Sequence, residues 1–337
     1  MIMKKGLIII SLIIIFIGIL WGNFTNLSKP YEKIGYALDT QIRIVVYDKG
    51  ADSDIVNKAY NEILRLEKIL SNFDEKSETY ILNKNKELNV SYELKSVILS
   101  GIEITNKTFG NYDLTIYPLS EIWNYKNKKV PSLDAIKEAK SLIGAENIKI
   151  SGCKVTLLNN AKIDVSSLAK GYIADSVIDL LKNNGIKNAL VDAGGNIKVI
   201  GSANGKNSSF KIGIKDPNKK ETDSIGYIQL KDKSIVTSGI YERNFTYEGK
   251  LYHHIIDPHT GYPSESDVVS ASVICENSMI ADAYATALVV MGADEGLKLI
   301  EQNEDLECIM VKKDNTVILS SGIKDFNLTD DNYKIGG

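Results

Sequence analysis

Asp282 and Thr286 are the first pair of residues whose types and spacing could do chemistry. They stand four residues apart in an alanine-rich stretch, so a helix would place both side chains on one face, one turn apart. A carboxylate and a hydroxyl on one face suit a hard cation, Mg²⁺ or Ca²⁺, because such ions prefer oxygen ligands. A capping aspartate followed by a threonine that bonds its own helix backbone would give the same pattern without a metal, and for this pair alone that interpretation is the commoner one.

A second group of residues lies in the stretch Ile163–Tyr172, which reads IDVSSLAKGY. The pattern predicts a short strand, a turn of small residues and the start of a helix. Small residues let a ligand approach the backbone, and free N–H groups at a helix N-terminus together with Lys170 favour an anion such as phosphate. The alternative is an ordinary helix start with a solvated lysine.

All three histidines of the chain fall in His253–Gly261, which reads HHIIDPHTG. Their spacing matches no H-E-x-x-H helix, and Pro258 would break any helix there, so we do not expect a zinc site. The residues from Asp257 onwards have the composition of a turn. We expect His253 and His259 to lie at the surface.

Two further stretches could contribute to a binding site. The run Gly110–Leu119, followed by Trp123, places aromatic residues beside a polar turn and could form one wall of a pocket for a planar ring. A core-facing loop is the alternative. Gly194-Gly195-Asn196 predicts a tight turn between strands, but it is not the G-x-G-x-x-G of a Rossmann-type dinucleotide site, and the chain contains no P-loop.

The composition is that of a globular protein. The 337 residues, 44% hydrophobic and 25% charged, are enough for one large domain or two ordinary ones. The net charge of -3 includes no basic stripe, so we expect no nucleic-acid binding. Cys275 and Cys308 lie in apolar, strand-like runs and should be buried, and the odd count of three cysteines argues against a disulfide framework.

The N-terminus has the pattern of an export signal. Lys4 and Lys5 precede the almost wholly apolar run Leu7–Trp21, and no A-x-A cleavage site and no lipoprotein cysteine follow. We therefore predict an uncleaved signal anchor at residues 1–22, a polar tether at 23–30 and one folded domain at 31–337. The lysines would stay inside, which places that domain outside the cytoplasm at the cell membrane. A cleaved signal peptide is the alternative.

The elements that must position these residues follow from apolar spacing. Helices are predicted at 52–70, 92–108, 133–142, 169–184 and 278–291. Strands are predicted at 36–47, 189–191, 197–200, 210–214, 225–230 and 252–256, with a hairpin formed by 309–311 and 317–319. This mixed order lacks a steady βαβ repeat and favours an α+β fold, one large domain with a smaller inserted lobe, over a doubly wound sheet.

Taken together, the order and spacing of the motifs resemble one family, the FAD:protein FMN transferases or ApbE family. The motifs that carry the resemblance are Gly110–Leu119, Asp164–Tyr172, Gly194–Ile197, His254–Gly261, Ala281–Ala287 and the stretch Leu70–Phe73 with Ser77 and Asn83. The resemblance implies an α+β flavin-transferase fold with FAD in a cleft between a main and a smaller lobe. It also implies a Mg²⁺ site formed by Asp282, Thr286 and the backbone carbonyl of Ser167.

By the same resemblance, FAD would contact nine residues. These are Asn111, Tyr112, Asp113, Asp164, Lys170, Gly194, Gly195, Asn196 and His254. Asp282, Thr286 and His254 would form the catalytic set.

The implied reaction attaches FMN to a partner protein. A serine or threonine hydroxyl of the partner would attack the FMN-side phosphorus of FAD, AMP would leave, and a phosphodiester would remain. His254 or a carboxylate would take the hydroxyl proton. The family suggests a membrane or surface redox flavoprotein as the acceptor, and this chain has no D-x-x-[ST]-[GSC]-A-[ST] acceptor pattern of its own.

Two departures from the family pattern bear on function. Phe73 stands where many transferases carry tyrosine and some FAD-hydrolysing members carry asparagine, and Leu38-Asp39-Thr40 replaces the family's M-G-T. Phe73 keeps the ring and loses the hydroxyl, which is closer to the transferase type. An FAD pyrophosphatase that releases FMN and AMP is the alternative enzyme. A surface flavin-binding protein without turnover is the alternative from another class, although a pure binder has no need of Asp282 and Thr286.

Overall fold

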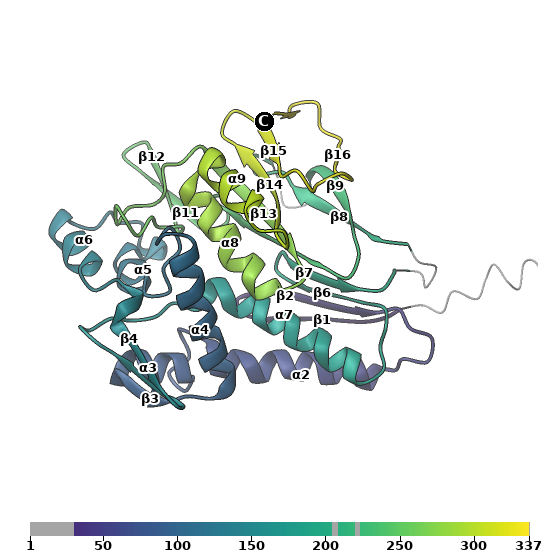
Figure 1. Ribbon diagram of the computed structural model, residues 1–337, viewed down its shortest axis with the longest axis horizontal. Coiled ribbons are helices and arrows are strands. Elements are labelled where there is room, and N and C mark those ends of the chain that lie inside the picture. The colour runs from purple at the N-terminus through teal and green to yellow at the C-terminus, as the bar shows by residue number, and fades with distance from the viewer. Residues whose placement is uncertain (1–29, 204–207, 220–222, 337) are drawn as a thin grey trace, which may run out of the picture.

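A nine-stranded sheet lies at the centre of the computed structural model, which describes residues 30–203, 208–219 and 223–336 (Figure 1). Within these residues, neighbouring strands of this sheet are antiparallel except β15 and β17. In spatial order the strands are β1 (Tyr31–Ala37), β2 (Thr40–Val46), β6 (Ala189–Ala193), β7 (Asn196–Ile200), β10 (Ser234–Gly239), β13 (Val268–Cys275), β14 (Glu307–Lys312), β15 (Thr316–Leu319) and β17 (Lys334–Ile335).

Side chains alternate between the two faces of the sheet along each strand, so both faces carry apolar residues. A different layer covers each face. On one face, Ile42, Ile44 and other apolar residues pack in the main core. The helices that share this core are α2 (Ser53–Leu70), α3 (Glu78–Asn85), α4 (Tyr92–Lys107), α7 (Ser166–Asn183), α8 (Ser278–Met291) and α9 (Ala293–Glu301). On the other face, Val45 and Leu190 belong to a second core with a three-stranded sheet, β16 (Asn327–Leu328), β9 (Ser224–Leu230) and β8 (Phe210–Lys215).

The chain between α2 and α7 forms the smaller lobe, on the left in Figure 1. It contains α3 (Glu78–Asn85), β3 (Glu87–Asn89), α4 (Tyr92–Lys107), α5 (Tyr117–Trp123), α6 (Leu133–Lys140), β4 (Ile148–Ser151), β5 (Lys154–Leu157) and short 3₁₀ turns at Tyr125–Asn127 and Ala145–Asn147. A third apolar cluster joins α5 and α6 to the ribbon of β11 (Asn244–Tyr247) and β12 (Lys250–His253).

The five predicted helices are confirmed, each within a few residues of its predicted bounds, and so is the predicted hairpin of β14 and β15. The prediction of one strand at 36–47 is wrong. Leu38 and Asp39 both adopt positive φ, 55° and 56°, and form a two-residue turn between β1 and β2. The buried positions predicted for Cys275 and Cys308 are confirmed, whereas Cys153 is exposed.

The predicted signal anchor lies outside the described residues, as does the predicted tether except for Pro30. None of the helices in the described ranges combines the length and the apolar character that crossing a membrane requires.

Candidate functional site

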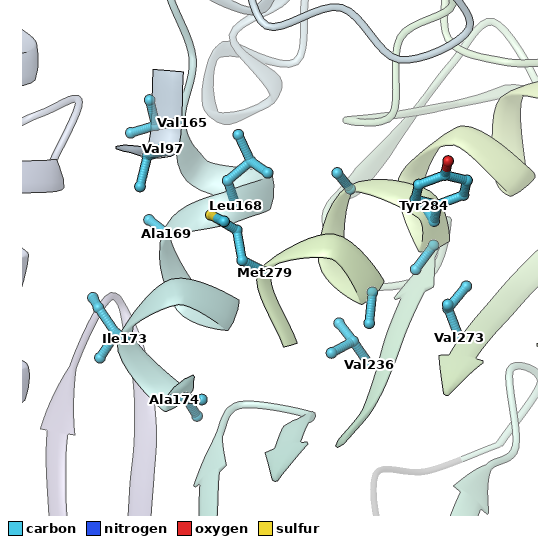
Figure 2. Close-up of a cluster of buried hydrophobic side chains, with 14 of the residues drawn as sticks. Val97, Val165, Leu168, Ala169, Ile173, Ala174, Val236, Val273, Met279 and Tyr284 are labelled. Carbon is cyan, nitrogen blue, oxygen red and sulfur yellow. The ribbon is translucent and has the colours of Figure 1, made fainter. Parts of the chain in front are cut away.

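Helices α7 and α8 approach each other closely at Gly171. A Cβ atom at this position would lie 2.2 Å from the carbonyl oxygen of Ser278, so only glycine permits the contact. Figure 2 shows how these two helices pack, with Met279 of α8 beside Leu168 and Ala169 of α7. This close approach brings the start of α7 next to the face of α8 that carries Asp282.

Asp282 is a buried carboxylate held by the two neighbouring elements. Its Oδ2 accepts hydrogen bonds from the backbone N–H of Gly171 on α7, at 3.2 Å, and from Nδ2 of Asn196 on β7, at 2.8 Å. Among the described residues these are its side-chain hydrogen bonds, so Oδ1 remains available to another ligand. Burial raises the pKa of Asp282, and the positive charge of Lys170 opposes that rise. A desolvated carboxylate with a free oxygen is suited to a cation.

Thr286 lies one turn beyond Asp282 and is partly buried. Its hydroxyl donates to the Asp282 backbone carbonyl, at 3.3 Å, and lies 3.2 Å from the hydroxyl of Ser238 at the end of β10. The bond to its own helix backbone is the one expected without a metal. No local pattern in the sequence predicts Ser238 as a neighbour of Thr286, because only the sheet order β10–β13 under α8 places it there.

Ser167 interrupts the first turn of α7, with φ −89° and ψ 15°. In a regular helix its carbonyl would pair with the N–H of Gly171, but that N–H donates to Asp282. A carboxylate, a hydroxyl and a backbone carbonyl are all hard oxygen donors, and they fit Mg²⁺, which commonly completes its shell with water and substrate phosphates. No group of three or more histidine, cysteine, aspartate or glutamate side chains in the described ranges could hold a metal on its own.

Tyr112 faces this site with a hydroxyl that has no hydrogen-bond partner among the described residues. The ring is buried, and the hydroxyl lies near Ser167 and within electrostatic reach of Asp164 and Asp282. Burial raises the pKa of Tyr112, so the hydroxyl stays protonated and can act only as a neutral donor or acceptor. Of the residues in this turn, it is the one whose polar atom is left for a ligand.

The side chains on either side of Tyr112 are used within their own turn. Nδ2 of Asn111 donates to the Thr108 carbonyl at 2.9 Å. Oδ1 of Asp113 accepts from the N–H and the hydroxyl of Thr115, at 2.7 and 2.6 Å, and burial raises the pKa of Asp113. These contacts shape the loop that presents Tyr112.

The segment that leads into α7, predicted as a short strand, is not a strand in the structure and is clamped by two buried asparagines. Asn83 exchanges two hydrogen bonds with the backbone of Ile163, at 2.7 and 2.8 Å. Asn72 donates to the Ile163 carbonyl at 2.9 Å and accepts from the Val165 N–H at 3.3 Å. Asp164, between them, accepts from the Ser166 N–H at 3.0 Å and is partly exposed. The sequence singled out both asparagines but gave them no role.

The turn between β6 and β7 presents Asn196 to Asp282. Gly194 and Gly195 both adopt positive φ, 66° and 97°, and a Cβ on Gly194 would lie 2.2 Å from Oγ1 of Thr40. Asp192 accepts from the Gly195 N–H at 2.9 Å. Lys170 lies within electrostatic reach of Asp192 and Asp282, so its positive charge acts on both carboxylates.

Of the three histidines, His254 lies within electrostatic reach of Lys170. Its Nδ1 lies 3.3 Å from the Arg243 carbonyl, so we assign the ring proton to Nδ1 and the acceptor role to Nε2. Burial, with the nearby charge of Arg243, lowers the pKa of His254 to about 3. The surface position predicted for His253 is wrong: the residue is buried and its Nε2 bonds the Ser264 carbonyl at 2.9 Å. His259 is exposed, as predicted, beside Gly110.

Known proteins resemble this chain in sequence and in fold. The chain matches the profile of the ApbE family over residues 38–310. It is 30% identical over 321 residues to the FAD:protein FMN transferase of Treponema pallidum, with 88% of each chain covered. Among solved structures, the ApbE protein of Thermotoga maritima superposes with a TM-score of 0.80 at 34% identity, covering 87% of this chain and 97% of the other. The flavin transferase ApbE of Vibrio cholerae superposes with a TM-score of 0.79 at 27% identity, covering 88% and 98%.

Proposed function

This chain belongs to the ApbE family and is an FAD:protein FMN transferase, and we propose that it transfers FMN to a protein hydroxyl at a Mg²⁺ site built on Asp282 and Thr286. The single observation that carries the metal site is the buried Asp282 carboxylate, which is held through Oδ2 by Gly171 and Asn196 while Oδ1 remains available. The Thr286 hydroxyl and the Ser167 carbonyl would complete the protein's share of the ligands. When bound, Mg²⁺ supplies charge neutralisation and Lewis acidity at the FAD pyrophosphate.

The other residues of the site would bind and orient FAD. Lys170 and the N-terminus of α7 favour the negative charge of the pyrophosphate. Tyr112 offers its unpartnered hydroxyl to an oxygen of the ligand. The predicted contacts of Asn111, Asp113, Asp164 and the Gly194–Asn196 turn stay predictions, with the Asn111 and Asp113 side chains acting through the shape of their loop.

In the transfer step, the serine or threonine oxygen of the acceptor forms a bond to the FMN-side phosphorus. The bond from that phosphorus to the bridging oxygen breaks, and AMP leaves with the electron pair. The hydroxyl proton passes to a nearby base. His254 is neutral in the free protein and accepts at Nε2, so it can orient the hydroxyl and receive this proton, although its lowered pKa makes it a weak base until anionic FAD is bound. A carboxylate is the alternative base.

FAD hydrolysis to FMN and AMP is the second candidate reaction, with water in place of the acceptor hydroxyl. The residue that bears on this choice is Phe73, whose side chain is 70% exposed and which keeps the aromatic ring of the transferase type but lacks the hydroxyl of the tyrosine in many transferases. The two reactions share every residue of the proposed metal site and differ in the nucleophile, a protein hydroxyl or water, that reaches the phosphorus.

We also propose that the chain works at the cell membrane with its folded domain outside the cytoplasm, and that its acceptor is a membrane or surface redox flavoprotein. Lys4, Lys5 and the apolar run Leu7–Trp21 support this location. Protease digestion of intact cells tests it, because an extracytoplasmic domain is cleaved and a cytoplasmic one is protected.

The reaction itself is tested with the full chain in detergent, incubated with FAD, Mg²⁺ and an acceptor domain that carries the D-x-x-[ST]-[GSC]-A-[ST] pattern. Intact mass spectrometry follows the acceptor and chromatography follows the nucleotides. We expect a covalent FMN adduct with release of AMP, dependent on Mg²⁺ and lost in Asp282→Ala. FMN and AMP without an adduct would favour hydrolysis. Transfer that is undiminished in chelator or in Asp282→Ala would contradict the proposed metal site.

A further inference from the structure

A buried ion pair lies one turn away from the candidate metal site and joins the same three elements. Asp175 stands four residues after Gly171 on α7, so both face α8. Lys198 stands two residues after Asn196 on β7, so both side chains point to one face of the strand. Asp175 and Lys198 bond each other directly, and their side chains are only 17% and 11% exposed.

Both members of the pair also hold the chain where α8 begins. Asp175 accepts hydrogen bonds from the backbone N–H groups of Ser278 and Met279, at 3.0 and 3.1 Å. Nζ of Lys198 donates to the carbonyl of Glu276 at 2.8 Å. These residues precede Asp282 by a turn or a turn and a half of helix. The pair therefore fixes the first turn of α8 to α7 and β7, just as Gly171 and Asn196 fix Asp282 itself.

Burying such a pair is expensive, since both charges lose their hydration. Burial raises the pKa of Asp175, and Lys198 and the N–H groups of α8 oppose that rise. Apolar residues of the same volume often stabilise a core as well as a buried ion pair does, so this pair is not explained by stability alone. Unlike apolar contacts, the ion pair and its hydrogen bonds are directional, so they allow α8 only one position along β7.

We propose that Asp175 and Lys198 are positioning residues, which set where Asp282 stands relative to Thr286, Ser167 and Asn196 and so determine the affinity of the metal site. This inference rests on the proposed function, because it takes Asp282 as a ligand of Mg²⁺. It adds a second set of residues to the site: the ligands bind the metal, and Asp175 and Lys198, one helical turn away, hold the ligands in place.

The test uses the full chain in detergent and Mn²⁺ as the metal, with FAD present, and measures free Mn²⁺ by electron paramagnetic resonance. Lys198→Met keeps the length of the side chain and removes the charge. We expect it to weaken Mn²⁺ binding about tenfold or more, because a movement of the first turn of α8 would displace Asp282 and the coordination shell tolerates little misplacement. Lys198→Arg keeps the charge and should stay within about threefold of the wild-type affinity. Asp175→Asn should behave as Lys198→Met does.

A second readout does not depend on the metal. Native-state hydrogen exchange of the Ser278 and Met279 amides should be faster in Lys198→Met and in Asp175→Asn, because Asp175 is the acceptor of both. Tyr333→Phe is the matched control: its hydroxyl bonds the buried Asp216 at 2.6 Å on the far layer of the molecule, so the change lowers stability without touching α8. It should leave Mn²⁺ affinity and the exchange of both amides unchanged.

The outcomes separate the inference from the function on which it rests. Wild-type Mn²⁺ binding together with an unchanged affinity in folded Lys198→Met and Asp175→Asn would overturn the inference and leave the metal site standing. A wild-type chain that binds no Mn²⁺ would overturn the proposed metal site and the inference with it. Equal loss of affinity in Tyr333→Phe would mean that general destabilisation is the cause, and would also overturn the inference.

Discussion

The side-chain amide of Asn196 donates to the carboxylate of Asp282 over 2.8 Å, although 86 residues of sequence separate them. Asn196 comes directly after the Gly194-Gly195 turn, and Asp282 lies in the second turn of α8. The contact explains what that glycine turn does: it lets β7 begin with an amide aimed at the one buried carboxylate on α8. The binding of a cation at Asp282 should therefore depend on Asn196.

Replacing Asn196 by leucine, which has a similar volume, should reduce kcat/KM for flavin transfer by about 10- to 100-fold. A hydrogen bond to a charged group contributes about 1.5–3 kcal/mol, and its loss leaves the buried carboxylate free to rotate away from the metal. Steady-state kinetics at varied FAD and Mg²⁺ measure the effect. The control is Asn147→Leu, which removes another buried asparagine, bonded to Asn159, and should affect stability alone. Equal kcat/KM in Asn196→Leu and wild type would contradict the role given to this contact.

Tyr112→Phe should stabilise the free protein and weaken its response to substrate. The hydroxyl is buried without a partner among the described residues, and an unsatisfied buried group costs about 1–3 kcal/mol. Removing it should raise the free energy of unfolding by about 1 kcal/mol. If the hydroxyl bonds FAD, the increase in Tm on adding FAD and Mg²⁺ should be smaller in the variant. Thermal unfolding with and without ligand checks both parts, and a less stable variant with an undiminished ligand shift would refute the assignment.

The sequence was sufficient to predict the pieces of the site but not how they meet. Helical spacing identified α8 and put Asp282 and Thr286 on one face, and the glycine pair correctly predicted the turn before Asn196. The contacts to Gly171 and Ser238 arise from the crossing of α7 and α8 over the sheet, which no local pattern encodes. The family resemblance predicted more of the site than the individual patterns did, because it assigned to one site motifs that only the fold brings together.

The local errors have local causes. The strand predicted at 36–47 is a hairpin, since its turn residues Leu38 and Asp39 adopt positive φ without a glycine to signal it. His253 was expected at the surface because of its polarity, yet it is buried through a hydrogen bond to the Ser264 carbonyl. In both cases tertiary contacts outweigh the preference of the residue type: the Leu38 N–H, for example, donates to Glu67 of α2 at 2.6 Å.

The free energy of unfolding should decrease in acid, and His254 should account for part of the decrease. Its pKa is about 3 in the folded protein and about 6.5 when free, so the unfolded chain binds a proton across this range that the folded chain does not. This contribution to stability is present above pH 6.5 and is lost as the pH falls toward 3. The stability of wild type relative to His254→Gln should therefore shrink between pH 7 and pH 4 in urea titrations. His259→Gln, a change at an exposed histidine, is the control and should show the same dependence of the free energy of unfolding on pH as wild type. If His254→Gln also showed the wild-type dependence, the prediction would be wrong.

Phe73 should control how the enzyme divides FAD between transfer and hydrolysis. The residue follows Asn72, whose amide oxygen accepts from the Val165 N–H, so the backbone at Phe73 is fixed near the start of α7. Its ring is 70% exposed, which means that substitutions there should change stability by no more than about 0.5 kcal/mol.

An aromatic ring at the edge of the site would exclude water from the phosphorus, whereas a small polar side chain would admit it. We expect Phe73→Asn to raise the ratio of free FMN to acceptor-bound FMN several-fold, and Phe73→Tyr to leave that ratio equal or lower. Chromatography of the nucleotides and intact mass of the acceptor, from the same reaction, give the ratio directly. Because both variants start from the same exposed position, a ratio that is the same in Phe73→Asn as in wild type would show that water access is set elsewhere in the site.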